Sequence, residues 1–180
     1  DFGNFNAGIN VYYNNAAPWT SVHPYSPGTG RMTVGDLDGN GKKDLIVDFG
    51  NFNAGINVYY NNSTPWTSLH PYGPGAYRMV TGDMDGNGKA DLIVDFGNFN
   101  AGINVYYNNA APWTSRHHWS PGSGRMAVGD MDEDGKADLI VDFGPPWGIN
   151  VYRNNAGPWT NIHSFSPGPG RMIVGNMDGN

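Results

Sequence analysis

The sequence GDMDGNGKADLIVDFG, from Gly82 to Gly97, joins an aspartate- and glycine-rich loop to a short apolar run. The loop segment Asp83–Asp91 carries side-chain oxygens at its first, third, fifth and ninth positions. The run that follows it, Leu92–Phe96, is rich in apolar and β-branched residues and is closed by glycine, as buried strands commonly are. The stretch therefore predicts a tight acidic turn that leads into a β-strand.

This stretch belongs to an internal repeat. The tripeptide Asp-Phe-Gly begins at Asp1, Asp48, Asp95 and Asp142, always 47 residues apart. The first fifteen residues recur unchanged in the second and third copies, whereas the fourth has Pro145-Pro146-Trp147 in place of four residues. Periods of about 40–50 residues are typical of β-propellers. We therefore divide the chain into a single propeller domain, residues 1–180, with repeats 1–47, 48–94, 95–141 and 142–180.

Each repeat is expected to form one four-stranded blade. Alternating or apolar runs separated by glycine, proline and asparagine predict strands, and no amphipathic helical stripe occurs. The fold class predicted is all-β, a β-propeller without helices. In the best-defined repeat the expected strands are Arg78–Thr81, Leu92–Phe96, Ile103–Tyr107 and Trp113–Trp119.

The register of the repeat gives three complete blades and one split blade. The split blade would take its first strand from Arg171–Val174 and its outer strands from Ile9–Tyr13 and Trp19–Tyr25. The Gly-Lys-Ala-Asp-Leu-Ile-Val stretch that should join these parts is missing. Three alternatives remain open: a segment of a longer array, a four-blade monomer, and an eight-blade ring made by a homo-oligomer of two chains.

The acidic loops predict calcium sites. Calcium binds about 6–8 hard oxygen ligands, and a tight loop can direct alternating side chains to one point. Glycine at the sixth position allows the bend that turns the carbonyl of the seventh residue inward. Simple asparagine and glycine turns without metal are the alternative, but three recurrences of clustered carboxylates favour a cation. We expect three calcium ions, with these ligands: Asp36, Asp38, Asn40, Lys42 and Asp44; Asp83, Asp85, Asn87, Lys89 and Asp91; Asp130, Asp132, Asp134, Lys136 and Asp138.

The charge balance agrees with this expectation. Ten of the sixteen acidic residues lie in these loops, and three calcium ions would cancel the formal charge of −6. An acidic chain without a basic stripe argues against nucleic-acid binding, and no apolar run reaches the length of a membrane span. The absence of cysteine suits a secreted or cell-surface protein. A fourth loop, Asn176–Asn180, lacks the first aspartate, so no intact site is expected there.

The quoted stretch resembles the FG-GAP/VCBS repeats of integrin-α-type propellers over essentially the whole chain. This resemblance implies a calcium loop between the two inner strands of each blade. A narrower similarity is to fungal lectins of the Psathyrella velutina type, whose sugar pockets lie between blades. It is carried by Trp, His and Arg ahead of the acidic loop, and it implies these sugar-binding candidates: Trp66, His70, Arg78, Trp113, His117 and Arg125.

These patterns favour a binding protein over an enzyme. No Ser/His/Asp set recurs and there is no cysteine nucleophile. The first hypothesis is a non-catalytic, calcium-stabilised extracellular scaffold or interaction module. The second is a lectin with sites at blade junctions, and the third is the propeller appendage of a secreted enzyme. For the repeated Trp and Arg residues, packing between blades is the alternative to ligand binding.

Overall fold

The computed structural model describes residues 8–13, 16–25, 28, 31–50, 54–60, 65–75, 78–97, 101–108, 110–120, 125–153, 158–168 and 170–175. All regular structure in these ranges is β, and none of it is helical. No helix in the described residues could cross a membrane. The strands are β1 (Ile9–Tyr13), β2 (Ala16–His23), β3 (Met32–Gly35), β4 (Asp44–Asp48), β5 (Ile56–Tyr59), β6 (Thr67–His70), β7 (Met79–Gly82), β8 (Asp91–Asp95), β9 (Ile103–Tyr107), β10 (Ala110–His117), β11 (Met126–Gly129), β12 (Asp138–Asp142), β13 (Ile149–Tyr152) and β14 (Thr160–His163).

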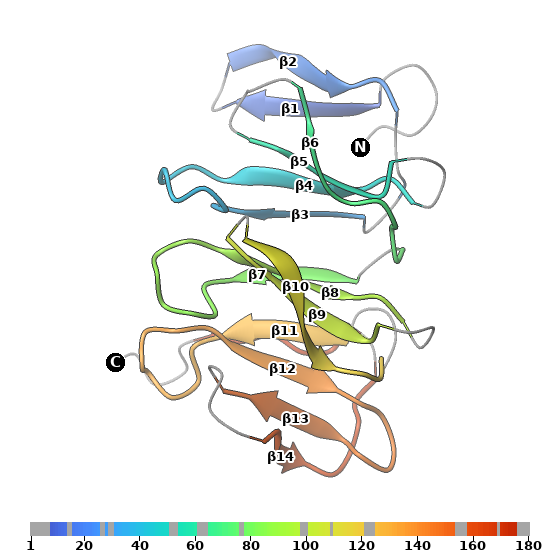
Figure 1. Cartoon of the computed structure of the whole chain (residues 1–180), viewed down its shortest axis with the longest axis vertical. Coiled ribbons are helices and arrows are strands. Elements are labelled where there is room, and N and C mark those ends of the chain that lie inside the picture. Colours follow the sequence, from blue (N-terminus) through green and yellow to red (C-terminus); the bar gives the residue numbers. More distant parts are fainter. Residues whose placement is uncertain are drawn as a thin grey trace.

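The strands form propeller blades, as the repeat predicts. Within the described residues, β3–β6, β7–β10 and β11–β14 are three four-stranded antiparallel sheets in chain order. We call them blades 1, 2 and 3. The pair β1–β2 is a two-stranded sheet that corresponds to the outer half of a blade. Figure 1 shows the sheets stacked along the long axis, with the turns β3–β4, β7–β8 and β11–β12 on the same edge, at the left.

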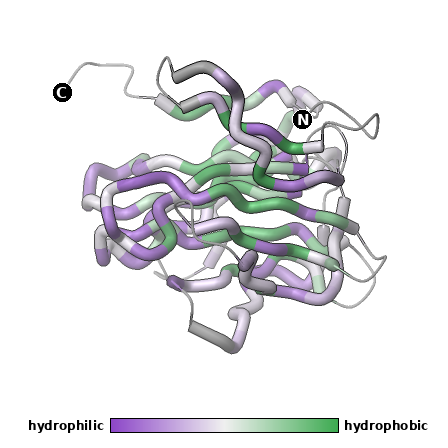
Figure 2. The backbone as a smooth tube through the Cα atoms, turned by 90° about the horizontal axis from the view of Figure 1, so that it is seen from above, coloured by the Kyte–Doolittle hydropathy of each residue, from purple (hydrophilic) through white to green (hydrophobic). Residues whose placement is uncertain are grey.

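The core lies between the blades because the second and third strands are apolar on both faces. Strands β8 and β12 are buried along their whole length. One apolar cluster joins Ile46 and Val58 of blade 1 to Leu92 and Val94 of blade 2. Figure 2 shows this apolar centre as a green band through the middle of the strands, with hydrophilic loops at the left margin. Each blade is therefore stabilised by its neighbours.

The first strands β3, β7 and β11 pack against one another along the inner side of the stack. A Cβ added to Gly35 would lie 3.0 Å from the Cβ atoms of both Ala90 and Thr81. The same position in blade 2, Gly82, faces Ala137 at 3.0 Å. Glycine at the end of each first strand thus allows the inner strands to approach closely.

The split blade differs from its prediction. Residues 171–175 are described, but they form no strand, because no second strand pairs with them in the described part of the chain. Val174 nevertheless packs against Gly129, as Thr81 packs against Gly35. The segment therefore occupies the position of the next inner strand without the hydrogen bonds of one.

A closed four-blade monomer is not what the structure shows. The β1–β2 sheet and blade 3 lie at opposite ends of the stack in Figure 1, so the described sheets form an open arc. Each apolar cluster joins only neighbouring sheets, and Ile9 of β1 packs with Val47 and Phe49 of blade 1. The two-chain ring stays a prediction that a solution mass would check.

Consecutive acidic loops also contact each other. The Asp36 carbonyl accepts a hydrogen bond of 2.7 Å from the Ala90 amide in the next loop. Gly86 has φ 76, and a Cβ there would lie 2.9 Å from Cγ of Lys136 in the following loop. In the third loop Glu133 stands at the equivalent position with φ 60. A left-handed conformation costs a non-glycine residue about 1–2 kcal/mol.

Two substitutions at this position should therefore have opposite effects. Glu133→Gly relieves the left-handed strain and should raise the unfolding free energy by about 1 kcal/mol. Gly86→Glu adds the strain and a clash with the Lys136 stem, so it should lower that free energy by at least about 1 kcal/mol. Urea denaturation of both variants measures the two shifts, and shifts of the same sign would contradict the assignment.

Candidate functional site

The first candidate site is the acidic loop between the first and second strands of each blade. Asp83 shapes the loop because its Oδ1 accepts the amide of Gly86 at 2.7 Å and its Oδ2 accepts that of Gly88 at 2.7 Å. In the loop of blade 1, Asp36 accepts the amides of Gly39 and Gly41 at the same distance of 2.7 Å. The first aspartate thus closes the turn whose sequence predicts it.

Three carboxylates meet at each loop. Their ligand atoms lie within 4.8 Å of one another in each group. The ninth-position aspartate begins the second strand and is fully buried, with Asp91 0% exposed. Burial raises the pKa of Asp91 to about 7, and the charges of Asp85 and Asp83 act in the same direction. The groups are Asp36, Asp38 and Asp44; Asp83, Asp85 and Asp91; and Asp130, Asp132 and Asp138.

The fifth-position side chains lie within the turn. Oδ1 of Asn87 accepts the Lys89 amide at 2.9 Å, and its Nδ2 donates to Asp85 Oδ2 at 3.0 Å. Asn40 and Asp134 accept the amides of Lys42 and Lys136 in the same way, each at 2.9 Å. Of the predicted calcium ligands, the structure therefore brings the side chains at the first, third and ninth positions into one cluster. The side chain at the fifth position instead accepts a hydrogen bond from a backbone amide of its own loop.

Asn108 is a loop neighbour that the sequence analysis did not identify. It follows β9, and its Nδ2 donates to Asp91 Oδ1 at 2.8 Å. Its Oδ1 is buried without a partner in the described part of the chain. In the sequence, the repeated Asn-Asn pair after each third strand is typical of a turn and does not indicate this contact. If the side-chain amide is rotated by 180°, its oxygen instead of its nitrogen faces the carboxylate cluster.

The third loop differs from the others in its surroundings. Nε of Arg153, which follows β13, lies 3.7 Å from Asp132 Oδ2. The equivalent residue in the other two blades is Tyr60 or Tyr107. Asp138 is fully buried, and its Oδ1 has no hydrogen-bond partner among the described residues. In this loop the Arg153 guanidinium therefore lies beside one carboxylate of the cluster, while a buried oxygen of another, Asp138, has no partner among the described residues.

The second candidate site is a pocket that recurs at the junctions between sheets, at the opposite ends of the strands from the acidic loops. The three pockets have volumes of about 400, 250 and 420 Å³, and we call them pockets I, II and III in chain order. Pocket I is lined by His23, Tyr25, Phe49, Ala54, Asn57 and Trp66; pocket II by His70, Tyr72, Phe96, Ala101, Asn104 and Trp113; and pocket III by His117, His118, Trp119, Phe143, Trp147, Asn150 and Trp159.

Each pocket is built from two consecutive sheets. In pocket II, His70 ends the fourth strand of blade 1, while Phe96 and Trp113 belong to blade 2. The ring centroids of His70 and Phe96 are 4.6 Å apart, and those of His70 and Trp113 are 5.5 Å apart in an edge-on arrangement. Pockets I and III repeat this triad with His23–Trp66 at 5.5 Å and His117–Trp159 at 5.6 Å.

The histidine of each pocket is oriented by its own backbone. Nδ1 of His70 lies 3.1 Å from both the amide nitrogen and the carbonyl oxygen of Tyr72, and Nδ1 of His117 lies 3.1 Å from the same two atoms of Trp119. The backbone therefore holds the ring in either tautomer. Nε2 donates to a ligand when Nδ1 accepts the amide, and it accepts when Nδ1 donates to the carbonyl.

An asparagine adds a second polar group to each pocket. Asn104 Nδ2 donates to the Ala101 carbonyl at 2.6 Å, and Asn150 Nδ2 donates to the Trp147 carbonyl at 2.9 Å. These bonds orient the amide, and the second N–H and the side-chain oxygen of Asn104 are the groups that it can offer to a ligand. The repeat shows Asn57, Asn104 and Asn150 only as a polar residue inside an apolar strand, a pattern that does not by itself indicate a pocket.

The structure separates the residues that the sequence grouped as sugar-binding. Trp66 and His70 line different pockets, because each His meets the Trp of the following repeat. Arg78 and Arg125 are not among the pocket-lining residues. Nη1 of Arg78 instead lies 3.7 Å from Asp95 Oδ1, and Nη1 of Arg125 lies 3.8 Å from Asp142 Oδ1.

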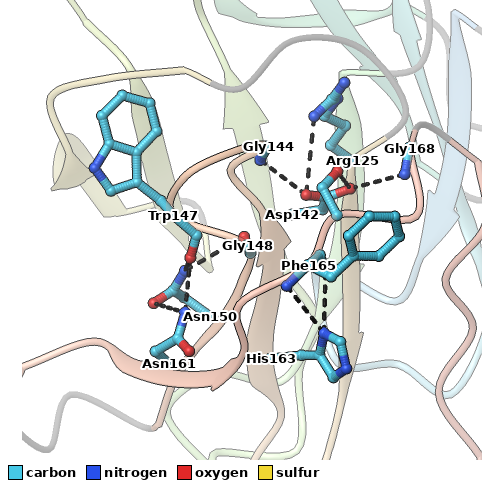
Figure 3. A network of polar contacts seen from close by, with 11 residues as sticks. Arg125, Asp142, Gly144, Trp147, Gly148, Asn150, Asn161, His163, Phe165 and Gly168 are labelled. Atoms are coloured by element: carbon cyan, nitrogen blue, oxygen red, sulfur yellow. Dashed lines mark hydrogen bonds and ion pairs between the residues drawn. The ribbon is translucent and has the colours of Figure 1, made fainter.

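Asp142 shows what these arginines hold. Its Oδ1 accepts the Gly144 amide at 2.8 Å, and its Oδ2 accepts the Ser166 hydroxyl at 2.6 Å and the Gly168 amide at 3.2 Å. Figure 3 shows Arg125 and the backbone of Gly144 and Gly168 converging on this carboxylate. The arginine therefore supports the linker that leaves the blade, next to the pocket floor at Phe143.

Comparison with known proteins gives a structural likeness. No protein-family model matches the chain, and no curated protein matches it either. Among solved structures, the chain is similar to a lectin from Agrocybe aegerita, whose structure was described as the basis of specific recognition of non-reducing terminal N-acetylglucosamine. The TM-score is 0.63 at 25% identity, over 87% of this chain and 47% of the lectin chain. The chain thus spans about half the length of that lectin.

This likeness supports the lectin side of the sequence-based resemblance. The neighbour is a fungal lectin, as the narrower similarity implies, and the propeller-like all-β fold is confirmed. The resemblance to FG-GAP/VCBS repeats has no counterpart among the family models and stays a prediction.

The histidine geometry gives a pH dependence. Burial lowers the pKa of His117, and the neighbouring His118 adds to this, outweighing the Trp119 carbonyl that favours the charged ring. Because the pKa of His117 is lower in the folded than in the unfolded protein, its neutral form contributes fully to the folding stability above the unfolded pKa of about 6.5. This contribution is lost as the pH falls through the lower pKa of the folded protein. Melting temperatures at pH 5 and pH 7.5 should therefore differ more for the wild type than for His117→Asn, which retains an acceptor. Equal differences would contradict the assignment.

Proposed function

We propose that this protein is a carbohydrate-binding β-propeller, with the pockets at the blade junctions as its binding sites. The observation that carries the proposal is the threefold recurrence of one pocket composition, an aromatic triad of His, Phe and Trp beside an asparagine. The lectin likeness favours this function over the scaffold hypothesis. Because the chain covers only part of that lectin, its ligand is assigned here from the pocket chemistry.

The pocket composition suits a sugar. A pyranose ring has one face of C–H groups, which needs an apolar platform, and hydroxyl groups at its edge, which need directed polar partners. In pocket II the Trp113 and Phe96 rings supply the platform, while His70 and Asn104 supply the polar groups that can hydrogen-bond to hydroxyls. Volumes of about 250–420 Å³ fit a terminal sugar better than a buried length of polysaccharide. Terminal N-acetylglucosamine, the sugar named for the Agrocybe aegerita lectin, is the ligand to test first.

The lining residues support binding over catalysis. Glycoside hydrolysis generally requires two carboxylates flanking the scissile bond. Among the described residues that line the three pockets, none is Asp or Glu. The aspartates of the acidic loops lie at the other ends of the strands.

A pocket variant tests the function. Trp113→Phe shrinks the platform of pocket II while leaving an aromatic ring in the core, so it should weaken N-acetylglucosamine binding at that pocket about fivefold to tenfold. Calorimetry on glycans that end in this sugar measures the loss. Trp19→Phe is the matched control, because Trp19 lies outside pockets I, II and III and should leave the affinity at these three pockets unchanged. No heat of binding with any terminal sugar would refute the proposal.

We further propose that the acidic loops bind calcium and stabilise the blades. Three carboxylates within 4.8 Å, with one of them buried, form an arrangement that a divalent cation would neutralise. The buried Asp138 Oδ1 without a partner and the raised pKa of Asp91 support this. The residues that would hold the ion are the three clustered aspartates of each loop. Calcium-stabilised glycan binding also suits the expected location outside the cell.

Calcium should raise the melting temperature, and EDTA should lower it. A ligand at 100 times its dissociation constant contributes about 2.7 kcal/mol per site. Asp91→Asn removes one ligand, so this variant should lose the calcium response of blade 2. At pH 8 without calcium it should be at least as stable as the wild type, since a pKa raised to about 7 makes the charged Asp91 unfavourable there.

Glu133→Gln is the matched control, since it also removes one negative charge but lies outside the carboxylate clusters. This variant should keep the full calcium response. Calorimetry should also find the third loop the weakest site, because Arg153 already lies beside Asp132. Three equal sites that persist in Asp91→Asn would contradict the proposed ligands, and no calcium heat at all would refute the metal site.

A further inference from the structure

Pocket III differs from pockets I and II in a coordinated way, and its difference deepens the proposed function, on which this inference rests. Trp119 replaces Tyr25 and Tyr72, and Trp147 stands where the other pockets have Ala54 and Ala101. The positions are equivalent because the conserved pocket asparagine donates to the carbonyl of Ala54, Ala101 or Trp147. The triad of His, Phe and Trp and the asparagine are the same in all three pockets, so these two replacements set pocket III apart.

The replacements extend the aromatic wall beyond the shared triad. Trp119 stacks on Phe143, with centroids 5.6 Å apart and an interplanar angle of 28°. Trp147 continues from Trp119, with centroids 5.2 Å apart. His118 stands where pockets I and II have Pro24 and Pro71, and it adds a polar ring stacked 5.0 Å from His117. Pocket III therefore has two indole surfaces that its counterparts lack.

Trp147 is exposed, yet its backbone is fixed. The residue is 57% exposed. Its backbone amide donates to the Gly144 carbonyl at 2.8 Å. Nδ2 of Asn161 donates to the Trp147 carbonyl at 2.7 Å, as Figure 3 shows. The equivalents of Asn161 in blades 1 and 2 are Ser68 and Ser115. A second difference, on the neighbouring strand β14, thus holds the backbone of the residue that carries the exposed indole.

We infer that pocket III is a distinct subsite that binds at least two linked sugar units, the terminal one on the shared triad and the next one against Trp147. An exposed, anchored aromatic surface beside a binding pocket is characteristic of ligand contact. In pockets I and II the described residue at this position is alanine, which offers a second sugar no comparable surface. The three pockets therefore differ in the length of glycan that they recognise.

The test compares N-acetylglucosamine with its β1,4-linked disaccharide. Indole N–H resonances of ¹⁵N-labelled protein report each pocket separately through Trp66, Trp113 and Trp159, with Trp147 assigned by its loss in Trp147→Ala. In the wild type, the disaccharide should bind pocket III about tenfold more tightly than the monosaccharide, and it should bind pockets I and II with no such preference.

Trp147→Ala should abolish that preference by lowering the disaccharide affinity at pocket III to that of the monosaccharide. Asn161→Ser, which restores the residue of the other blades, should reduce the preference while the fold is retained. Trp19→Ala, an exposed tryptophan outside the described pockets, should change neither affinity. The melting temperature of each variant shows that the protein remains folded.

The outcomes separate this inference from the proposed function. Equal disaccharide preference in all three pockets, or a preference that survives Trp147→Ala, would overturn the inference while leaving the lectin function intact. If neither sugar shifts any pocket resonance, the proposed function fails and this inference fails with it.

Discussion

The buried aspartate at the end of each second strand is the contact on which the blade junction depends. Asp48 accepts the amide of Gly50 at its own strand end and that of Gly75 in the linker to blade 2, each at 2.7 Å. Asp142 binds its own linker in the same way, through Gly144 and Gly168. Because a buried carboxylate is stabilised by hydrogen bonds, Asp48 and Asp142 each hold the linker that follows their blade in one path. The phenylalanine that follows the aspartate is then fixed in the floor of a pocket.

The sequence predicts those features that are local. The acidic loop, the four strands of a blade and the aromatic residues of the pocket are all visible within one 47-residue unit. The pairing across blades is not visible, because adjacent residues in a repeat face different junctions. His70 meets Trp113, 43 positions away, and not Trp66, which is closer in the chain. Arg78 resembled a ligand donor because its partner Asp95 lies on another strand of the blade.

The segment at residues 171–175, which was expected to be a strand and forms none, illustrates a different limit. Its sequence matches the first strand of every other blade, and Val174 does pack against Gly129. Backbone pairing nevertheless needs a second strand beside it, and no propensity within five residues supplies one. Trp147 shows that a replacement visible in the sequence can also need the structure for its interpretation. Only the structure shows that the Trp119 ring packs beside its indole and that Asn161 holds its backbone.

The acidic loops and the pockets occupy opposite ends of the same short strands. Strand β8 begins at Asp91 of a loop and ends at Asp95, beside Phe96 of pocket II. A five-residue strand is about 17 Å long, so an ion in the loop could not touch a ligand in the pocket. Any influence of one on the other would pass through the stability of the strand between them.

Each pocket straddles two sheets, and neither sheet forms it alone. In a stack of repeats, cohesion comes from interfaces between nearest neighbours, so the weakest junction limits the whole array. A ligand bound across such a junction would stabilise it, because separating the two sheets would destroy the binding site. Pockets that repeat along one edge also place several such stabilising sites at fixed intervals. A branched glycan that reached two of them would gain avidity from their high effective concentration and would resist the opening of the arc.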